Sequence, residues 1–302
     1  MKLSSFDQLK LAKDENSIEI TGDLLKKCQQ IQLSITDDIA NVCEKYGINY
    51  TLGGGSALGA VRHQGMIPWD DDIDLNVMRK DCEKLVEALE REYPGKYWIR
   101  TPEHTKDYGL LFIQVRLKGT IMRGREDMDN NECGIGLDIF PYENTFDSKV
   151  LRTFHGIVCL GMKFALSCRK TWKYRKLNLK LVENDPSAKK TIVIKCFIGA
   201  ILSFISIDAW THGTISCCKM CKNNKTKYVV IPSGRKQFFG EIYERTEVDD
   251  TIFVPFEGRK FRLLRNVDGY MKKLYGDYMQ IPPVEKREHH IVYELDFGKY
   301  NG

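Results

Sequence analysis

The chain has 302 residues, of which 42% are hydrophobic and 29% are charged, and its formal net charge is +5. This composition excludes a globally disordered chain, and the length suits one large domain or two small ones. The charge is uneven, because the segment 149–227 holds sixteen Lys or Arg against three acidic residues, about +13, which leaves about −8 for the remainder. We therefore expect the basic segment to meet membrane headgroups or a phosphorylated partner, and we expect no nucleic-acid partner.

The N-terminal residues 1–20 lack the apolar stretch of a secretory signal, which predicts a cytoplasmic chain with reduced thiols. Most of the ten cysteines are then expected to be small core residues. Cys218 and Cys221, together with His212 and Cys217, have the spacing of metal ligands, but no second pair follows. Plain buried thiols are the preferred interpretation, and a zinc site is the alternative.

The first half of the chain predicts alternating helices and strands. Apolar residues recur at helical spacing over 22–46 and predict one long amphipathic helix. A short strand, 48–52, ends at Gly53, Gly54 and Gly55, and a helix over 56–63 is expected after that turn. A strand over 72–78 and a helix over 79–92 follow.

The next strands are indicated by alternation over 110–117 and by the run "IGLDIFP", 135–141, which Pro141 is expected to stop. Helices are expected to dominate 148–225. The stretch 191–207 is the most apolar, but Lys195 interrupts it and it is short for a span of about 20 residues. It predicts an interfacial helix on an anionic leaflet or, equally, a core helix with a solvated basic neighbourhood.

The C-terminal part predicts a hairpin over 251–264 and a last amphipathic helix over 267–279, halted before Pro282. The fold class expected is α+β, with a mixed β-sheet core flanked by helices and a helical insertion. The expected domains are a catalytic core, 1–148, a basic and membrane-facing helical insertion, 149–225, and a C-terminal hairpin and helix that return to the core, 226–302.

The stretch "GMIPWDDDIDLNV", 65–77, crowds four carboxylates beside apolar residues. If the strand extends back to residue 70, then Asp70, Asp72 and Asp74 share one face, because side chains of a strand alternate. Carboxylates this close raise one another's pKa values or need a cation between them. The stretch therefore predicts a site for Mg²⁺ or Mn²⁺, both of which suit oxygen ligands.

The glycine turn supplies the second half of the prediction. Backbone N–H groups at Gly54, Gly55 and Ser56 would cradle phosphate at a helix start, and Arg62 would add a charge-assisted contact. A phosphate cradle beside a metal site is the equipment of phosphoryl or nucleotidyl transfer. The alternative is a solvated acidic loop after a glycine turn, against which Trp69 and the apolar flanks argue.

The stretch "GGGSALGAVRHQGMIPWDDDIDLNVMRKD" closely resembles the signature of the LicD family of phosphocholine transferases, to which fukutin and the fukutin-related transferases are similar. The segments "GLDIFPYEN", "FVPFEG" and "YGDYMQIPPVEKREHH" also resemble blocks of this family, whereas about 150–225 is weakly covered. The resemblance implies a nucleotidyltransferase-like fold, a divalent metal, and transfer of a phosphoalcohol from a CDP-activated donor to a glycan.

Carried over by position, the resemblance gives Gly54, Gly55 and Ser56 to donor phosphate. It gives Asp72 and Asp74 to the metal, with Asp70 as their neighbour. It implies Asp138 as the third carboxylate, which agrees with the expected orientation of that residue in its strand. The gap between the glycine turn and the paired acids is longer than in simple nucleotidyltransferases, so the phosphate-binding residues are less fixed than the metal ligands.

Further substrate contacts are expected from charged and aromatic residues. Arg116 would contact phosphate, or would form an ordinary surface ion pair. The basic C-terminal Lys286, Arg287, His289 and His290 would fold over the acidic site, or would remain a solvated tail. Trp69 would give choline an aromatic wall, or would belong to the core.

The reaction expected is attack of an acceptor hydroxyl on the distal phosphorus of CDP-choline with release of CMP. Asp72 and Asp74 would hold metal, and Asp138 would bind metal or accept the hydroxyl proton. The acceptor would be a teichoic acid or lipopolysaccharide precursor, lipid-linked at the inner face of the plasma membrane. The alternatives are another CDP-activated phosphoalcohol, such as ribitol or glycerol phosphate, nucleotidyl transfer from an NTP, and an inactive membrane-bound scaffold.

Overall fold

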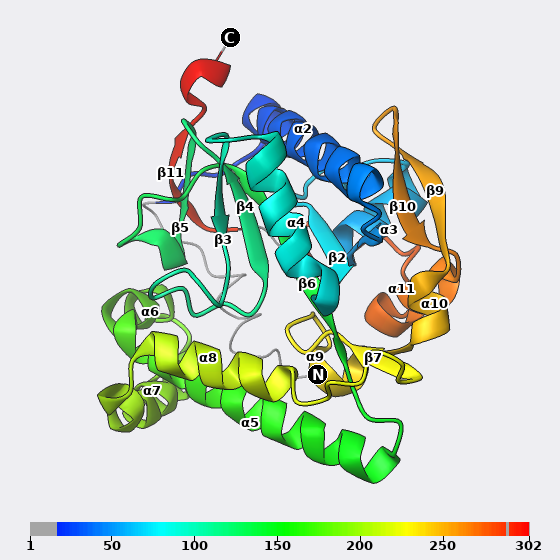
Figure 1. Ribbon diagram of the computed structural model, residues 1–302. Helices are drawn as coiled ribbons and strands as arrows, with labels where there is room; N and C mark the ends of the chain where they lie inside the picture. The colour runs from blue at the N-terminus through cyan, green and yellow to red at the C-terminus, as the bar shows by residue number, and fades with distance from the viewer. Residues whose placement is uncertain (1–16, 288–289, 302) are drawn as a thin grey trace.

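The computed structural model describes residues 17–287 and 290–301, and a mixed sheet forms its centre (Figure 1). Strands β1, β2, β6, β4 and β3 lie side by side in that order, and β7 and β8 extend β6. Only the β2–β6 pair is parallel among these neighbours. The expected α+β class with a mixed sheet is confirmed. The strands of this sheet span β1 Tyr50–Leu52, β2 Asp74–Met78, β3 Tyr97–Arg100, β4 Ile113–Leu117, β6 Gly136–Asn144, β7 Tyr228–Val230 and β8 Ile242–Glu244.

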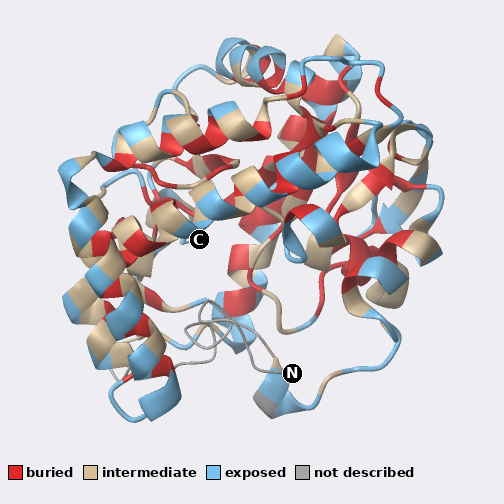
Figure 2. Ribbon diagram, turned by 90° about the horizontal axis from the view of Figure 1, so that it is seen from below, coloured by how far each residue is buried: buried red, intermediate tan, exposed pale blue. Residues whose placement is uncertain are grey.

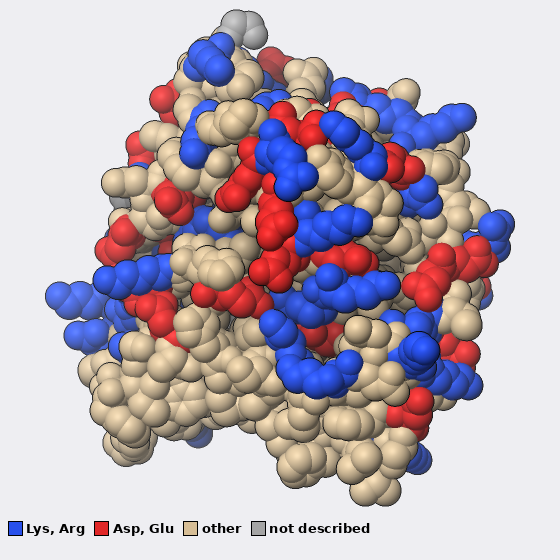
Figure 3. Space-filling model, in the orientation of Figure 1, with Lys and Arg blue, Asp and Glu red and all other residues tan. Residues whose placement is uncertain are grey.

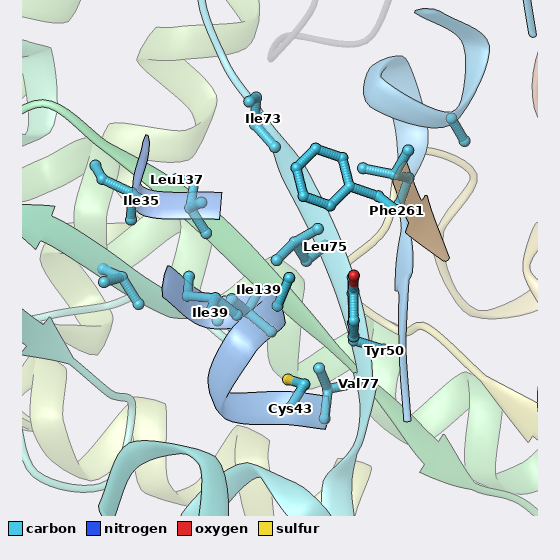
Figure 4. Packing of buried hydrophobic residues seen from close by; sticks show 14 of the residues in the cluster. Ile35, Ile39, Cys43, Tyr50, Ile73, Leu75, Val77, Leu137, Ile139 and Phe261 are labelled. Carbon is cyan, nitrogen blue, oxygen red and sulfur yellow. The ribbon is translucent and has the colours of Figure 1, made fainter. Parts of the chain in front are cut away.

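The main core lies between this sheet and helices α2 (Gly22–Tyr46) and α4 (Arg79–Glu92). The close view in Figure 4 shows Ile35 and Ile39 of α2 beside Leu137 and Ile139 of β6, with Leu75 of β2 next to them. The helical spacing on α2 and the alternation on the strands are therefore what bring these residues into one cluster.

Strand β6 does not stop at Pro141, as the sequence predicted, but continues to Asn144. On one side β2 pairs with it from Asp138 to Tyr142, and on the other side β4 pairs as far as Ile139 while β7 begins at Glu143. Pro141 thus lies where the second side changes partner, so its missing N–H costs no hydrogen bond in that ladder.

The expected strand over 72–78 begins later, at Asp74, and residues 70–73 are irregular. The shared face predicted for Asp70, Asp72 and Asp74 therefore does not come from strand alternation. The turn in which the Asp70 N–H donates to the Ile67 carbonyl at 2.9 Å sets the chain direction here. Ile73 is fully buried and still anchors the segment in the core.

The C-terminal part packs on the same core. The hairpin of β9 (Thr251–Phe256) and β10 (Arg259–Leu264) and helix α11 (Val267–Tyr275) contribute Phe256, Phe261 and Tyr270 to the main cluster. Helix α11 ends at Tyr275 rather than near 279, because Gly276 adopts a positive φ of 70°. The sequence did not predict β11 (Val292–Asp296), which pairs with β5 (Ile121–Gly124).

Helices α5 to α8 form a separate layer at the bottom of Figure 1. Asp185 caps α7 through two backbone N–H groups with Pro186 at the first position, and the Ser206 hydroxyl caps α8. A Cβ on Gly199 would lie 2.1 Å from the Cys168 carbonyl oxygen, so α5 and α7 cross at close range. The helices of this layer span α5 Lys149–Lys173, α6 Arg175–Leu181, α7 Pro186–Ile201, η2 Leu202–Phe204 and α8 Ile207–Cys218.

By length and composition, α5 is the one described helix able to cross a membrane unaided. The pair formed by 186–204 and 207–218 passes the same test together, with a bend of 97°. The remaining short elements are α3 Gly54–His63, α9 Gln237–Gly240, α10 Arg245–Asp249, η1 Arg125–Asp127, η3 Val284–Lys286 and η4 Gly298–Tyr300.

Candidate active site

The glycine turn lies directly against the carboxylates. A Cβ on Gly54 would lie 2.8 Å from Asp74 Oδ2, and a Cβ on Gly55 would lie 2.8 Å from Asp70 Oδ2. Gly54 also has a positive φ of 43°. These positions therefore need glycine both for the turn and for the close approach of two acids to the start of α3.

Two hydrogen bonds fix this turn to its surroundings. The Asp74 N–H donates to the Ser56 hydroxyl at 2.8 Å, and the Gly54 N–H donates to the Tyr270 hydroxyl of α11 at 3.1 Å. Ser56 therefore positions the first residue of β2, and the Gly54 N–H expected for donor phosphate already has a partner within the chain. No pattern in the sequence predicted that α11 would reach this turn.

Two glutamines of α2 hold the irregular segment that carries the acids. Gln29 Nε2 donates to the Asp70 carbonyl at 2.9 Å, and Gln32 Nε2 donates to the Asp71 carbonyl at 2.7 Å. Gln32 also donates to the Gly136 carbonyl at 3.2 Å, which ties the segment to the start of β6. Because residues 70–73 lack strand pairing, these amides take its place.

The three consecutive acids Asp70, Asp71 and Asp72 bring ligand oxygens within 4.8 Å of one another. Burial, together with the neighbouring carboxylates, raises the pKa of the Asp70 carboxyl well above its ordinary value. Negative charges held this close and partly out of water need positive charge between them. The oxygen-rich set fits a hard divalent cation such as Mg²⁺ or Mn²⁺.

Asp71, which sequence reasoning did not assign to the site, points to His290. The ring Nδ1 of His290 lies 2.8 Å from Asp71 Oδ1, and the backbone N–H of His290 donates to Asp71 Oδ2 at 3.2 Å. Burial alone would raise the pKa of Asp71, but the charge and hydrogen bonds of His290 outweigh it and leave the pKa lowered. His290 Nε2 also lies 3.7 Å from Asp72 Oδ2, so this histidine joins the C-terminal segment to the acids.

Asp138 lies beside Asp74 in the parallel register of β2 and β6. Its Oδ1 accepts a hydrogen bond of 3.0 Å from Gln114 Nε2 on the neighbouring strand β4. Burial raises the pKa of the Asp138 carboxyl, although Arg116 and the Gln114 hydrogen bond oppose that rise. Asp138 is thus an oriented carboxyl that holds a proton more readily than an ordinary aspartate.

A buried polar chain supports Asp138 from behind. Arg100 Nη1 donates to Gln114 Oε1 at 3.3 Å and to Asp127 Oδ1 at 2.8 Å. Since Arg100 occupies both the amide oxygen and Asp127, the amide nitrogen of Gln114 is directed toward Asp138. This series of hydrogen-bonded side chains is shielded from solvent, because all three of its members are buried, namely Gln114, Arg100 and Asp127.

A cationic cluster surrounds Trp69, next to the acids. The guanidinium of Arg287 lies 3.9 Å from the Trp69 ring centre, and that of Arg62 lies 5.7 Å from it. Burial lowers the pKa of Arg62, and the charge of Arg287 lowers it further. Two guanidinium groups held on one ring are suited to a phosphate, and Trp69 stacks here on cations of the chain itself.

The other predicted residues lie as follows. Arg116 donates to the Gly134 carbonyl at 3.2 Å and its charge reaches Asp138. Lys286 is exposed at the end of η3, and His289 lies outside the described residues. Cys218 and Cys221 are buried thiols and His212 is exposed, and within the described ranges the acids Asp70–Asp72 are the group close enough to share a cation.

Three features together characterise the fold and its site. They are a mixed sheet with a glycine turn, clustered carboxylates near the starts of two parallel strands, and flanking cations. Residues 47–156 match the family model described as LicD/FKTN/FKRP, nucleotidyltransferase domain. The predicted resemblance to the LicD family is therefore confirmed for the region that contains the acids.

Individual relatives extend this match over most of the chain. The chain is 27% identical over 290 residues to the lipopolysaccharide cholinephosphotransferase LicD of Haemophilus influenzae, covering 89% of this chain and 97% of that protein. It is 48% identical over 50 residues to the human ribitol 5-phosphate transferase FKRP, covering 16% of this chain and 10% of that protein. Both relatives are named as transferases of a phosphoalcohol.

Proposed function

We propose that the chain transfers a phosphoalcohol from a CDP-activated donor to a hydroxyl of a glycan precursor, with phosphocholine from CDP-choline as the first candidate. The observation that carries the proposal is the clustering of Asp70, Asp72, Asp74 and Asp138 around the glycine turn. The match to a cholinephosphotransferase over most of the chain supports the choice of phosphocholine and of a lipopolysaccharide-type acceptor.

The metal belongs to this proposal. Asp70 and Asp72 would hold Mg²⁺ or Mn²⁺, with Asp74 beside them at the start of β2. When bound, such an ion would neutralise the charge of the donor pyrophosphate. Asp71 would stabilise the position of the acids through its contacts with His290, and it would not bind the donor.

Arg62 and Arg287 would bind the donor phosphates. Their guanidinium groups lie on one aromatic ring, and Arg62 interacts with Asp70, so they lie beside the acids rather than at a distance. Guanidinium groups pair with phosphate oxygens in a bidentate manner. A trimethylammonium group would compete with Arg287 for the face of Trp69, so in this proposal Trp69 acts first through the two arginines.

Asp138 would act as general base. The acceptor oxygen forms a bond to the distal phosphorus, the bond from that phosphorus to the CMP oxygen breaks, and the hydroxyl proton passes to Asp138. A raised pKa brings a carboxylate closer to the range where it accepts a proton effectively. Gln114 would keep the accepting oxygen in place through its 3.0 Å hydrogen bond.

The test is CMP release from CDP-choline in the presence of Mg²⁺ and a glycan precursor. Asp72→Asn and Asp74→Asn each remove one negative charge at nearly constant shape, and each should lower turnover by at least about 1000-fold. Asp129→Asn, at an exposed position, is the matched control and should keep full turnover. Full turnover in both site variants, with circular dichroism like that of the parent, would remove the assignment.

Ribitol phosphate is the second candidate, because the 50-residue match to FKRP has the higher local identity of 48%. A panel of CDP-choline, CDP-ribitol and CDP-glycerol separates the candidates by which donor gives CMP when acceptor is added. Release of pyrophosphate from an NTP, without CMP from any of the three donors, would instead indicate nucleotidyl transfer.

A further inference from the structure

Helices α5 and α7 expose an unusual amount of apolar surface. The described residues include seventeen large hydrophobic side chains that are exposed, and ten of them lie between residues 150 and 204. Phe204 is 80% exposed, Val150 is 78% exposed and Phe197 is 68% exposed. Exposed apolar side chains are ordinary when scattered, but a concentration on one layer marks an interaction surface.

The exposed residues follow one stripe on each helix. Val150, Phe154, Ile157, Gly161 and Phe164 are spaced by four, three, four and three residues, which keeps them on one side of α5. A second stripe runs along α7 and into η2 with the same kind of spacing. Its members are Val193, Ile194, Phe197, Ile201 and Phe204.

We call the two stripes together the apolar face. The two helices cross closely at Gly199 and Cys168, and on α7 Gly199 lies with the buried residues, on the side away from the stripe. On α5, Cys168 follows Phe164 by four residues, so α7 packs on the C-terminal end of the same side that carries the α5 stripe. Figure 2, which looks at the molecule from below, shows exposed positions recurring along the helices on this side. The lower margin of Figure 3 carries few charged side chains, whereas acids and bases crowd the upper part.

We propose that the apolar face docks on the surface of an anionic lipid bilayer. Charge complementarity selects this occupant, because the segment 149–227 holds sixteen basic residues against three acidic ones. Lys189 and Lys190 are exposed at the start of the α7 stripe, and Lys149 is exposed at the start of the α5 stripe. Apolar side chains flanked by lysines are the pattern of a segment that lies in the headgroup region.

The helices lie along the bilayer and do not span it. The other side of α5 is bound to the rest of the protein by polar contacts that lipid would break. His155 Nδ1 lies 3.1 Å from the Thr145 hydroxyl, Lys163 donates to the Pro232 carbonyl, and Lys170 pairs with Glu126 at 2.6 Å. A helix with one side fixed in this way offers only its other side to lipid.

A second copy of the chain fits the same surface less well. In a two-fold dimer the same patch is used on both subunits, so the basic segment of one copy would meet that of the other. An anionic bilayer offers the opposite charge and a continuous apolar phase. Docking goes beyond the proposed reaction, although it would place the enzyme where a lipid-linked acceptor is found.

Vesicle flotation of the full chain tests the proposal. We expect binding to phosphatidylcholine vesicles with about 30% phosphatidylglycerol to exceed binding to pure phosphatidylcholine vesicles by at least about tenfold. Phe154→Ser with Phe197→Ser should lower that binding by about tenfold or more, and Lys189→Glu with Lys190→Glu should lower it and reduce the effect of salt. Phe253→Ser, an exposed phenylalanine of β9 that lies outside the apolar face, is the control and should bind like the parent.

The proposal is overturned if the parent chain does not bind anionic vesicles or if the apolar-face variants bind them like the parent. It is also overturned if light scattering shows that the parent is a dimer and that the Phe154→Ser, Phe197→Ser variant is a monomer, because the face would then be a self-association surface. The changed side chains are exposed, so circular dichroism should be unaltered. CMP release from CDP-choline with a soluble acceptor should also be unaltered, which separates failure of docking from failure of the proposed reaction.

Discussion

The acidic site and the apolar face depart from the usual distribution of residues in opposite ways. In the site, carboxylates are held together and partly withdrawn from water, so that burial and mutual repulsion raise the pKa of Asp70. On the apolar face, phenylalanine and aliphatic side chains that would normally be buried are exposed, Phe204 by 80%. Each arrangement is unfavourable for the isolated chain.

Each region is incomplete by itself, and its chemistry indicates what completes it. Oxygen ligands with excess negative charge call for a hard cation, and an apolar stripe beside lysines calls for an anionic lipid surface. The two regions also differ in how they are fixed. The acids are held by hydrogen bonds from α2 and β4. The helices of the apolar face, α5 and α7, are held by packing against each other and by a few polar contacts with the rest of the protein.

Among three further changes that bear on this comparison, the largest effect is expected at Asp138. Asp138→Asn removes the proton acceptor and a negative charge while keeping the shape of the side chain, so the turnover rate should fall by about 100- to 10,000-fold. Release of CMP under saturating donor measures it. The double variant of the apolar face should keep its turnover with a soluble acceptor, so loss in that variant as well would erase the distinction between the two regions.

A smaller effect is expected when the support of the acids is removed. Gln32→Leu keeps the size of a buried side chain but removes the amide that binds the Asp71 and Gly136 carbonyls. Two buried carbonyls then lose a donor, so the free energy of unfolding should fall by about 1–3 kcal/mol and turnover by about tenfold.

Thermal unfolding and CMP release measure these two changes for Gln32→Leu. Gln30→Leu, at an exposed position on the same helix, is the matched control and should change neither. Unchanged turnover with lowered stability would show that α2 supports the fold but does not position the acids.

The smallest effect on turnover is expected at buried Glu241, whose charge interacts with that of Lys163 of α5. Burial raises the pKa of Glu241 to about 7, although Lys163 and the Lys236 N–H oppose the rise. The folded state therefore binds the proton more tightly than the unfolded chain, whose carboxyl titrates near its ordinary value of 4.5. The contribution of Glu241 to the free energy of unfolding should accordingly fall as pH rises from about 4.5 to about 7.

In the Glu241→Gln variant the free energy of unfolding should fall less over this pH range than in the parent, by up to about 3 kcal/mol. Chemical unfolding of both proteins at pH 5 and pH 8 measures the difference. If the parent chain is instead more stable at pH 8 relative to the variant, Glu241 is stabilised as a charged partner of Lys163.

The sequence allowed much of the core to be predicted, because periodicity depends on local residues. The spacing of apolar residues on α2 predicted its observed limits, and the alternation on β4 predicted its end at Leu117 but placed its start three residues before Ile113. Asp138 was also placed on the strand where it is found, whereas α3 begins at Gly54, two residues before the expected start of that helix. The strand limits at Asp74 and Asn144 were missed, because they depend on which neighbours pair with each strand.

Contacts between distant segments could not be predicted for the same reason. His290 meets Asp71 across 219 residues of sequence, and Tyr270 meets Gly54 across 216. One signal was present but not used. Gln32 interrupts the apolar stripe of Cys28, Ile35 and Ile39 on α2, and a polar residue at such a position indicates a buried hydrogen bond.

Calorimetric titration of the chain with Mn²⁺ tests the central claim most directly, because it asks whether a cation completes the acidic site without requiring donor or acceptor. We expect saturable binding in the parent chain, loss of that binding in Asp72→Asn, and unchanged binding in Asp129→Asn. Absence of binding in the parent, or equal binding in the parent and Asp72→Asn, would contradict the claim that these carboxylates are brought together to hold a metal ion.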